Sequence, residues 1–311
     1  MRRYVRDVIG GAFALYLGKT KAFHDARARA LSGDAILSVY FHDPTRRIFE
    51  GCVQWLGENG FKFLSAEELQ EILSSQRRPP GPSVWLSIDD AWRGNLENVV
   101  PVVRRHRIPI TLFIPVGPVE DNGVLWWSHI RRHRQHLPDE FRQDYEKFWH
   151  VPEKVRRRIV QELMEAFPFK GPREVLTIQE LKEIADIPQV TLGAHSVHHC
   201  NLVECDADEL EEEMLGCKQK LEEWTGKGVK GFSYPRGYHD DRVLRALASY
   251  RYEFAATTEW RAISLNENPL LLPRFCVQDG GFVCEAHCHL LGIWDPLVRS
   301  AKTRLETWRR H

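Results

Sequence analysis

The chain has 311 residues, 43% of them hydrophobic, which is enough to bury one large core of a single α/β domain. Its 43 basic and 43 acidic residues give a formal net charge of zero, and this balance argues against a general nucleic-acid binder. The seven cysteines show none of the spacings of a disulfide framework, so we expect thiols in a reducing compartment.

The N-terminal segment, residues 1–34, combines basic and apolar residues. Arg2, Arg3 and Arg6 precede an apolar run over 8–17. This combination resembles a short signal peptide. No small-residue cleavage site follows, and the run is too short to span a bilayer. We therefore predict a basic amphipathic helix in preference to a cleaved signal. Such a helix would pack on the rest of the chain or lie on a membrane surface.

Strand-like and helix-like stretches alternate after this segment. Apolar runs predict strands at 35–41, 61–64, 84–88 and 110–114, and an amphipathic pattern predicts a helix at 46–59. Because strands alternate with helices, we expect a parallel sheet in an α/β fold.

The alternation breaks between about 123 and 175. Trp126 and Trp127 are followed by basic residues and by two helical stretches, so the segment is longer than a crossover needs. Insertions after barrel strands lie on the active-site face, and we predict a helical insertion that forms a lid or a substrate wall. The two tryptophans offer a stacking surface for a sugar ring. The arginines at 156–158 are interpreted as a solvated helical face.

The alternation resumes after the insertion. A capping box at Thr177 and Glu180 begins a helix that leads to a strand at 189–192, and another strand follows at 229–234. Between these strands, residues 208–224 place apolar side chains at helical spacing, opposite a strongly acidic face. We expect the apolar side of this helix to pack in the core.

Two adjacent carboxylates, Asp89 and Asp90, end the predicted strand at 84–88. Folds of this class place their chemistry at the carboxyl ends of parallel strands. Neighbouring carboxylates stay ionised at low cost only when a cation or a strong donor holds one of them, so the pair indicates a metal or an arginine. The alternative is the N-cap of a following helix.

Three histidines crowd the turn after the strand at 189–192. His195 and His199 are four residues apart, so they can face the same way and leave room for a third ligand, for which Asp90 is the natural candidate. Three protein ligands with an open fourth position are typical of a catalytic metal site. His198 is the competing ligand, because spacings of three and four both suit one turn.

Four stretches follow the order of the motifs of polysaccharide deacetylases of the NodB-homology type, and the chain resembles this family. Leu86–Asp90 resembles the motif T-F-D-D, and His195–His199 resembles H-[ST]-x-x-H. Phe232–Gly237 resembles F-x-Y-P-x-G, and Leu272–Phe275 resembles the segment that closes the core. The resemblance implies a metal-dependent sugar deacetylase on a distorted (β/α) barrel over residues 35–295, with the helical insertion described above.

The resemblance also implies where the catalytic acid lies. In many family members this histidine lies near the C-terminus, after an apolar strand and before an aspartate. No such element follows Arg274, whereas Val39–Asp43 resembles it at the N-terminus. The chain thus resembles the circularly permuted branch that includes deacetylases of biofilm poly-N-acetylglucosamine, with His42 as the candidate acid. The alternative is a histidine that caps a strand and has no catalytic role.

Roles for single residues follow from this resemblance. The implied catalytic residues are Asp89 as general base, His42 as general acid, Arg236 as the position of an oxyanion-binding N–H, and Arg274 as the residue that orients Asp89. The implied substrate contacts are Tyr234, Pro235, Trp92, Trp126 and Trp127. Asp90, His195 and His199 would hold a divalent metal, zinc first, with cobalt, nickel or manganese as alternatives.

Two C-terminal features remain. The cysteines and histidines of 276–289 form one irregular cluster rather than two paired ligand spacings, so no structural zinc site is predicted.

Residues 296–311 place apolar side chains on one helical face and five basic residues against the single Glu306 elsewhere. A basic amphipathic helix of this kind suits an anionic membrane surface. We expect a cytoplasmic protein. Its two ends leave two interpretations open: both helices pack against the barrel, which is preferred, or they attach the protein to the inner membrane.

Three functions fit these residues. The first is a hydrolase that removes N-acetyl groups from amino sugars of a polysaccharide, an oligosaccharide or a lipid-linked glycan. The second is an O-deacetylase or an N-deformylase on the same scaffold. The third is a non-catalytic glycan-binding relative, which is disfavoured because Asp89 is present although metal binding does not need it. The expected partner is an N-acetylated glycan and not a nucleic acid, and no protein partner is inferred.

Overall fold

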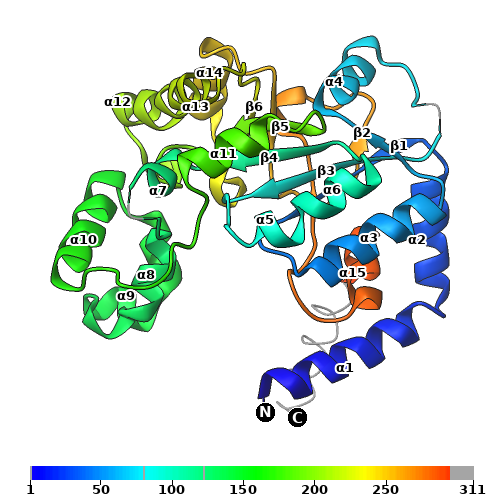
Figure 1. Cartoon of the computed structure of the whole chain (residues 1–311), viewed down its shortest axis with the longest axis horizontal. Helices are drawn as coiled ribbons and strands as arrows, with labels where there is room; N and C mark the ends of the chain where they lie inside the picture. Colours follow the sequence, from blue (N-terminus) through cyan, green and yellow to red (C-terminus); the bar gives the residue numbers. More distant parts are fainter. Residues whose placement is uncertain (1, 80, 122, 295–311) are drawn as a thin grey trace.

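The computed structural model describes residues 2–79, 81–121 and 123–294, and it shows a mainly parallel sheet with helices packed around it (Figure 1). The strands are β1 (Ala35–Phe41), β2 (Lys62–Leu64), β3 (Ser83–Asp89), β4 (Ile110–Ile114), β5 (Val190–Ala194), β6 (Gly231–Ser233), β7 (Phe254–Ala256), β8 (Ile263–Ser264) and β9 (Phe275–Cys276). Among the pairings of these strands, only that of β1 with β8 is antiparallel. The expected α/β fold with a parallel sheet is confirmed.

The strand order explains how the sheet becomes a barrel. It runs β7-β6-β5-β4-β3-β1-β8, with β2 paired to β3 and β9 paired to β1. A bridge between Ala256 and Leu272 joins β7 to the chain that leads into β9. Residues 272–276 therefore lie between β7 and β1 and close the sheet into an irregular barrel, as the resemblance implies.

Helices cover the outside of this barrel. They are α1 (Arg2–Leu17), α2 (Lys21–Leu31), α3 (Arg46–Glu58), α4 (Ala66–Ser75), α5 (Asn95–Asn98), α6 (Val100–His106), α7 (Val116–Glu120), α8 (Trp126–Arg132), α9 (Asp139–Gln143), α10 (Glu153–Ala166), α11 (Ile178–Ala185), α12 (Ala207–Leu210), α13 (Cys217–Thr225), α14 (Asp241–Ser249) and α15 (Val283–Leu290). The predicted capping box at Thr177 and Glu180 does begin α11. The predicted helix over 208–224 is also present, but a π-helical segment, η4 (Glu211–Gly216), separates α12 from α13.

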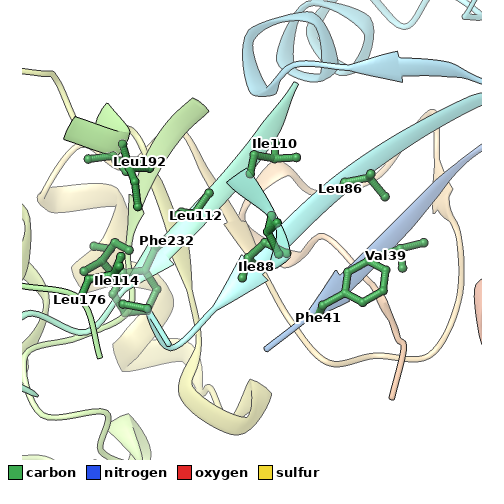
Figure 2. Close-up of a cluster of buried hydrophobic side chains, with 14 of the residues drawn as sticks. Val39, Phe41, Leu86, Ile88, Ile110, Leu112, Ile114, Leu176, Leu192 and Phe232 are labelled. Atoms are coloured by element: carbon green, nitrogen blue, oxygen red, sulfur yellow. The ribbon is translucent and has the colours of Figure 1, made fainter. Parts of the chain in front are cut away.

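Apolar side chains on the outer face of the sheet form the main core (Figure 2). Val39 and Phe41 of β1 lie beside Leu86 and Ile88 of β3, and the aliphatic residues of β4 continue the layer. Helices α3 and α6 pack on this layer through Ile48, Phe49, Val102 and Val103, all buried. Burial of this layer fixes the register of the parallel strands, because a shift by one residue would turn each apolar set to the other face.

The inner face of the sheet carries both apolar and polar side chains. Successive side chains of a strand point to opposite faces, so Trp85, Ser87 and Asp89 of β3 all face the barrel interior. Trp85 packs there edge-on against Phe113 and Phe254, with ring centroids 6.2 and 5.9 Å away. Aromatic rings thus fill part of the barrel interior, and the same alternation brings Asp89 to the open carboxyl end.

The chain between β4 and β5 builds a separate helical lobe. Helices α8, α9 and α10 gather beside the sheet (Figure 1), and they enclose a cluster that includes Trp126, Ile130, Phe148 and Leu163. Because the lobe has an apolar core of its own, it presents a defined wall next to the carboxyl edge of the barrel.

The N-terminal helices pack on the last described helix. Ala14 and Leu17 of α1 are buried in a cluster with Cys288 of α15 and with Trp294. Leu15 and Tyr16, on the other side of α1, are 62% and 66% exposed. Within the described ranges no helix combines the length and the apolar character that a bilayer crossing needs. The basic helix predicted at 296–311 lies outside the described residues.

Candidate metal centre and active site

Three buried side chains converge at the carboxyl end of the barrel. Asp90 follows β3, while His195 and His199 follow β5, and their ligand atoms all lie within 4.8 Å of one another. The Oδ1 atom of Asp90 is 3.4 Å from Nε2 of His195 and 3.3 Å from Nε2 of His199. The structure thus brings together the three residues that the sequence singles out as metal ligands.

Several residues around the site have unfavourable backbone conformations. Asp90 and His199 have φ angles of 74° and 49°, and Ala91 and Ser196 also lie in the left-handed region. This region is unfavourable for residues with a Cβ atom, by about 1–3 kcal/mol each. Four such residues around one site indicate that the surrounding structure holds the ligand geometry in place.

Hydrogen bonds fix the orientation of two of the ligands. His195 Nδ1 donates to the carbonyl oxygen of Ser233 at 2.7 Å, which leaves the lone pair of Nε2 directed toward Asp90. The Trp92 indole donates from Nε1 to Asp90 Oδ2 at 3.2 Å. A carbonyl behind a histidine ligand and a donor behind a carboxylate ligand are the usual supports of a metal site.

The unpaired carboxylate oxygen of the triad fits a cation. Asp90 Oδ1, which lies near Nε2 of both histidines, is buried and has no hydrogen-bond partner among the described residues. Burial opposes ionisation of Asp90, but the neighbouring His195 and His199 imidazoles hold the pKa of that carboxyl well below its usual value. Burial lowers the pKa of His199, which favours the neutral ligand form. Two imidazoles and one carboxylate oxygen suit a divalent transition metal.

Asp89 is held by a fully bonded arginine. Arg274 is completely buried, and its Nη1 and Nη2 atoms donate to the two carboxylate oxygens of Asp89, each at 2.8 Å. The remaining N–H groups donate to Ser87 Oγ, Ser233 Oγ and the carbonyl of Thr257, at 2.9, 2.8 and 3.1 Å. All five donors are therefore satisfied, and the bidentate contact sets the plane of the Asp89 carboxylate.

This pairing also fixes the charge of Asp89. Burial by itself would raise the pKa of the carboxyl group, but the Arg274 guanidinium and then His195 more than offset it, and the pKa stays below its usual value. Asp89 is thus ionised near neutral pH, although it is only 3% exposed.

His42 lines the same cavity as Asp89 and the three ligands. Its backbone is tied on both sides, because the N–H donates to Asp279 Oδ1 at 3.1 Å and the carbonyl accepts from Asn95 Nδ2 at 3.0 Å. Burial raises the pKa of Asp279, and His42 acts against that effect. Asp279, which the sequence did not point to, therefore lies close to the candidate acid.

Arg236 lies in a tight turn, η5 (Pro235–Gly237), with φ 57° and ψ 7°. Its N–H donates to no acceptor in the described part of the chain, so this donor is available at the cavity. The side chain pairs with Glu146 at 2.6 Å and lies over the Trp149 ring at 4.6 Å. The guanidinium is thus engaged elsewhere, and the backbone N–H is the group free to serve the site.

The cavity has a volume of about 590 Å³, and its aromatic lining differs from the expected one. Trp127 and Tyr234 line it as expected, and Trp149 lines it as well. Trp126 is instead buried and donates from Nε1 to the carbonyl of His198 at 3.0 Å. Trp92, which bonds Asp90, and Pro235 do not line it either.

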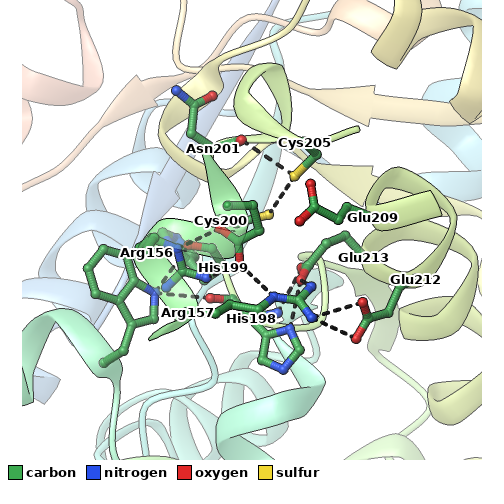
Figure 3. A network of polar contacts seen from close by, with 12 residues as sticks. Arg156, Arg157, His198, His199, Cys200, Asn201, Cys205, Glu209, Glu212 and Glu213 are labelled. Carbon is green, nitrogen blue, oxygen red and sulfur yellow. Dashed lines mark hydrogen bonds and ion pairs between the residues drawn. The ribbon is translucent and has the colours of Figure 1, made fainter. Parts of the chain in front are cut away.

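Glu213 holds His198 in an orientation that differs from that of His199 (Figure 3). Its carboxylate accepts from the His198 backbone N–H at 2.8 Å and bonds the His198 ring at Nδ1 at 2.7 Å. Arg157 donates to the same carboxylate at 2.7 Å. These bonds turn His198 away from the triad while His199 faces it, and η4 is the segment that carries Glu213 into this position.

The interpretation of residues 156–158 as a solvated face is wrong for the first two. Arg156 is 3% exposed, pairs with the buried Glu153, and lies over the Trp126 ring at 4.5 Å. Arg157 bonds Glu153 as well as Glu213, and of the three only Arg158 stays largely in solvent. Glu213, an acidic residue of the helix predicted over 208–224, is also completely buried. Ion pairs formed in the folded chain determine which of these charged side chains are buried, and the charge pattern of the sequence does not reveal those pairs.

Comparisons with known proteins agree with this architecture. The family model described as "Polysaccharide deacetylase" matches residues 76–255. A poly-beta-1,6-N-acetyl-D-glucosamine N-deacetylase of Staphylococcus aureus (strain MSSA476) is 21% identical over 276 residues, which are 83% of this chain and 77% of that protein. YxkH of Bacillus subtilis (strain 168) is 21% identical over 76% of this chain, which spans 66% of the length of YxkH.

The fold is shared with a solved structure. IcaB from Ammonifex degensii superposes with a TM-score of 0.59 at 16% identity, over 85% of this chain and 99% of IcaB. The family model itself covers more than half of the chain, and it includes β3 with Asp89 and Asp90, the histidine turn and the Arg236 turn. The chain belongs to the polysaccharide deacetylase family.

Proposed function

We propose that the chain is a metal-dependent deacetylase that removes N-acetyl groups from amino sugars of a polysaccharide, an oligosaccharide or a lipid-linked glycan. The observation that carries the proposal is that Asp89, paired with the buried Arg274, lines the same cavity as Asp90, His195 and His199. A metal-binding site alone would not need a second carboxylate with its own buried arginine. The pair supports a base that acts on a water molecule next to the metal.

Asp90, His195 and His199 would hold the cation, with zinc as the first choice and cobalt, nickel or manganese as alternatives. A divalent cation supplies a Lewis acid that polarises an amide carbonyl and makes a water molecule more acidic. Asp89 accepts the proton of the attacking water, and Arg274 keeps its carboxylate ionised and oriented. The backbone N–H of Arg236 donates to the developing oxyanion.

His42 protonates the leaving amine. It lines the cavity from the end of β1, and Asp279 lies beside it. An amine leaves only with a proton, and a histidine separate from the base can supply it while Arg274 keeps Asp89 ionised. The bonds that Asp279 and Asn95 make to the His42 backbone hold this side chain at the cavity.

A panel of variants tests the proposal. We expect purified protein with added Zn²⁺ to release acetate from N-acetylated glycans. Asp89→Asn is expected to lose about a hundredfold to ten-thousandfold in rate and keep its metal, because a general base contributes that much. Asp90→Asn should lose metal and activity together, and His42→Ala should slow turnover with the metal retained. Asp208→Asn, an exposed aspartate outside the cavity, is the matched control.

The panel also separates the proposal from its competitors. Release of formate instead of acetate would make the chain a deformylase, and release of acetate only from O-acetylated glycans would make it an esterase. A loss of tenfold or less at Asp89 would refute its role as the base. Glycan binding without any acyl release would leave a binding protein.

The location of the enzyme is a further part of the proposal. We place it in the cytoplasm, in peripheral contact with an anionic membrane. Seven free cysteines without a disulfide support a reducing compartment. Exposed Leu15 and Tyr16 on α1 support a lipid contact, whereas the burial of Ala14 and Leu17 against α15 supports simple packing.

A further inference from the structure

The outer part of the active-site cavity is rich in arginine. Arg131, Arg134 and Arg236 line it, and Glu146 is the carboxylate that lies among them. Glu146 pairs with Arg236 at 2.6 Å. In the described chain no carboxylate forms an ion pair with Arg131 or Arg134, so two positive charges at the cavity lack a counterion from the protein.

The Arg134 side chain is held in place without losing its charge. Its Nε donates to the backbone carbonyl of Arg142 at 3.0 Å, and its Nη2 donates to the carbonyl of Gln143 at 3.3 Å. Carbonyl oxygens orient a guanidinium but do not neutralise it. The Nη1 atom makes no hydrogen bond within the described residues, so part of the guanidinium stays available for an anion.

Two aromatic side chains of the same wall have unsatisfied polar atoms. Tyr145 and Trp149 line the cavity, and the Tyr145 hydroxyl and Trp149 Nε1 are buried without a hydrogen-bond partner among the described residues. Trp149 is only 4% exposed. A buried donor without a partner is costly, and a ligand oxygen that accepts from it removes that cost.

The three arginines of the cavity lie close enough to the Tyr145 hydroxyl to influence its pKa. Burial raises the pKa of Tyr145 to about 12, and the nearby Arg131, Arg236 and Arg134 act in the opposite direction. Trp127 completes the wall, and its ring lies 4.2 Å from the ring of the metal ligand His199. An aromatic surface beside the metal thus leads directly into a group of cations and hydrogen-bond donors.

We propose that this outer part of the cavity is a phosphate subsite, so that the preferred substrate is an N-acetylated amino sugar that carries a phosphate group. The sugar ring packs on Trp127, the more exposed of the two tryptophans, with its acetamido group directed toward Asp90, His195 and His199, and the phosphate contacts Arg131 and Arg134. Tyr145 donates to a phosphate or sugar oxygen. The phosphate belongs to a glycosyl phosphate, as in lipid-linked sugars, or to a phosphodiester within a glycan. This inference rests on the proposed deacetylase function.

Surface arginines without a ligand are the competing explanation. Arg158, on α10 of the same lobe, provides the comparison, because it is 70% exposed, does not line the cavity, and has only Glu162 at 3.9 Å. If Arg131 and Arg134 served only solubility, their replacement would have no more effect on ligand binding than replacement of Arg158.

The test is equilibrium binding to the zinc-loaded enzyme, measured by calorimetry. The probes are N-acetylglucosamine 1-phosphate, its methyl phosphodiester and the neutral methyl glycoside of N-acetylglucosamine. The proteins are wild type, the double variant Arg131→Gln with Arg134→Gln, and Arg158→Gln. We expect wild type to bind the phosphorylated sugars at least about tenfold more tightly, since two exposed ion pairs contribute roughly that factor. The preference should weaken as salt is added.

Each outcome decides a separate point. The double variant should lose the preference and keep its affinity for the neutral glycoside, while Arg158→Gln should behave as wild type. Equal affinity of wild type for charged and neutral sugars would overturn the subsite. A preference that survives in the double variant would also overturn it, because the phosphate would then be bound at the metal. Tighter binding of the monoester favours a glycosyl phosphate substrate, and tighter binding of the diester favours a polymer.

Acetate release, measured on the same samples, reports on the enzymatic proposal by itself. A phosphate preference in binding without any acetate release would refute the deacetylase function and leave the subsite intact. Equal acetate release from charged and neutral sugars, without a binding preference, would support the deacetylase function and refute the phosphate subsite.

Discussion

Replacement of Glu213 by Gln is the perturbation that most directly tests how the histidine turn is supported. The Glu213 carboxylate is completely buried and bonds the His198 backbone, the His198 ring and Arg157. Glutamine keeps the shape of the side chain and removes its charge. Because His199 follows His198 directly, loosening of this support should disturb a metal ligand that Glu213 does not itself touch.

The expected magnitude follows from the pKa of Glu213. Burial opposes its ionisation, but the hydrogen bonds of His198 and the charge of Arg157 lower its pKa from 4.5 to about 2. Each pH unit of difference between folded and unfolded states is worth about 1.4 kcal/mol, so the ionised group stabilises the fold by about 3 kcal/mol. Since the pKa is depressed on folding, this contribution is fully present above about pH 5. It is lost as the pH falls toward 2.

The assay is urea unfolding of wild type and Glu213→Gln between pH 7 and pH 3, followed by tryptophan fluorescence, with zinc affinity measured at neutral pH. We expect Glu213→Gln to be less stable by about 3 kcal/mol at pH 7, with a gap that narrows below pH 5. Zinc affinity should fall about tenfold to a hundredfold, as for other residues that support a metal ligand.

Glu212→Gln is the matched control for this experiment. Glu212 lies in the same π-helical segment and also pairs with Arg157, at 2.9 Å, but it is about half exposed. Exposed ion pairs contribute about 0–1 kcal/mol, so this variant should stay close to wild type. A Glu213→Gln variant no less stable than Glu212→Gln, or a stability gap independent of pH, would show that Glu213 does not brace the turn by its charge.

The histidine turn and the chain ends carry the remaining predictions. His199→Ala should abolish zinc retention in a metal titration, while His198→Ala should still bind zinc; the reverse result would assign the third ligand to His198. If α1 and the basic C-terminal segment attach the enzyme to lipid, the intact protein should co-sediment with anionic vesicles, stay free of neutral ones, and be released by salt, because each basic residue near an anionic surface contributes about 1 kcal/mol. Equal behaviour on both vesicle types would contradict membrane attachment.

The central residues of the candidate site could be predicted from the sequence because they lie at the ends of strands. Asp90 follows an apolar run and His195 follows a strand-like stretch, and parallel strands bring their carboxyl ends to one edge. Arg274 also followed from its motif, since a buried carboxylate needs a cation of fixed geometry. These positions depend on where strands end and on the parallel order of the sheet. Both follow from the alternation of strand-like and helix-like stretches along the chain.

The surroundings of the centre could not be predicted in the same way. Glu213 reaches His198 from a π-helical segment, which helical periodicity does not reveal. Trp126 and Trp127 are neighbours on α8, so their side chains diverge and only one can face the cavity. Trp149 takes the second place on that wall because the lobe folds back over the barrel edge. Such contacts depend on how one helix packs on another.

The helical lobe therefore has two separable roles. Arg157 and Trp126 brace the histidine turn from behind, through Glu213 and through the carbonyl of His198, so their loss should weaken metal binding. Arg131 and Arg134 lie on the cavity side of the same lobe and touch none of the ligands. Because the two sets share a scaffold but no contact, substitution at the cavity side can change which sugar is preferred while the metal site stays intact.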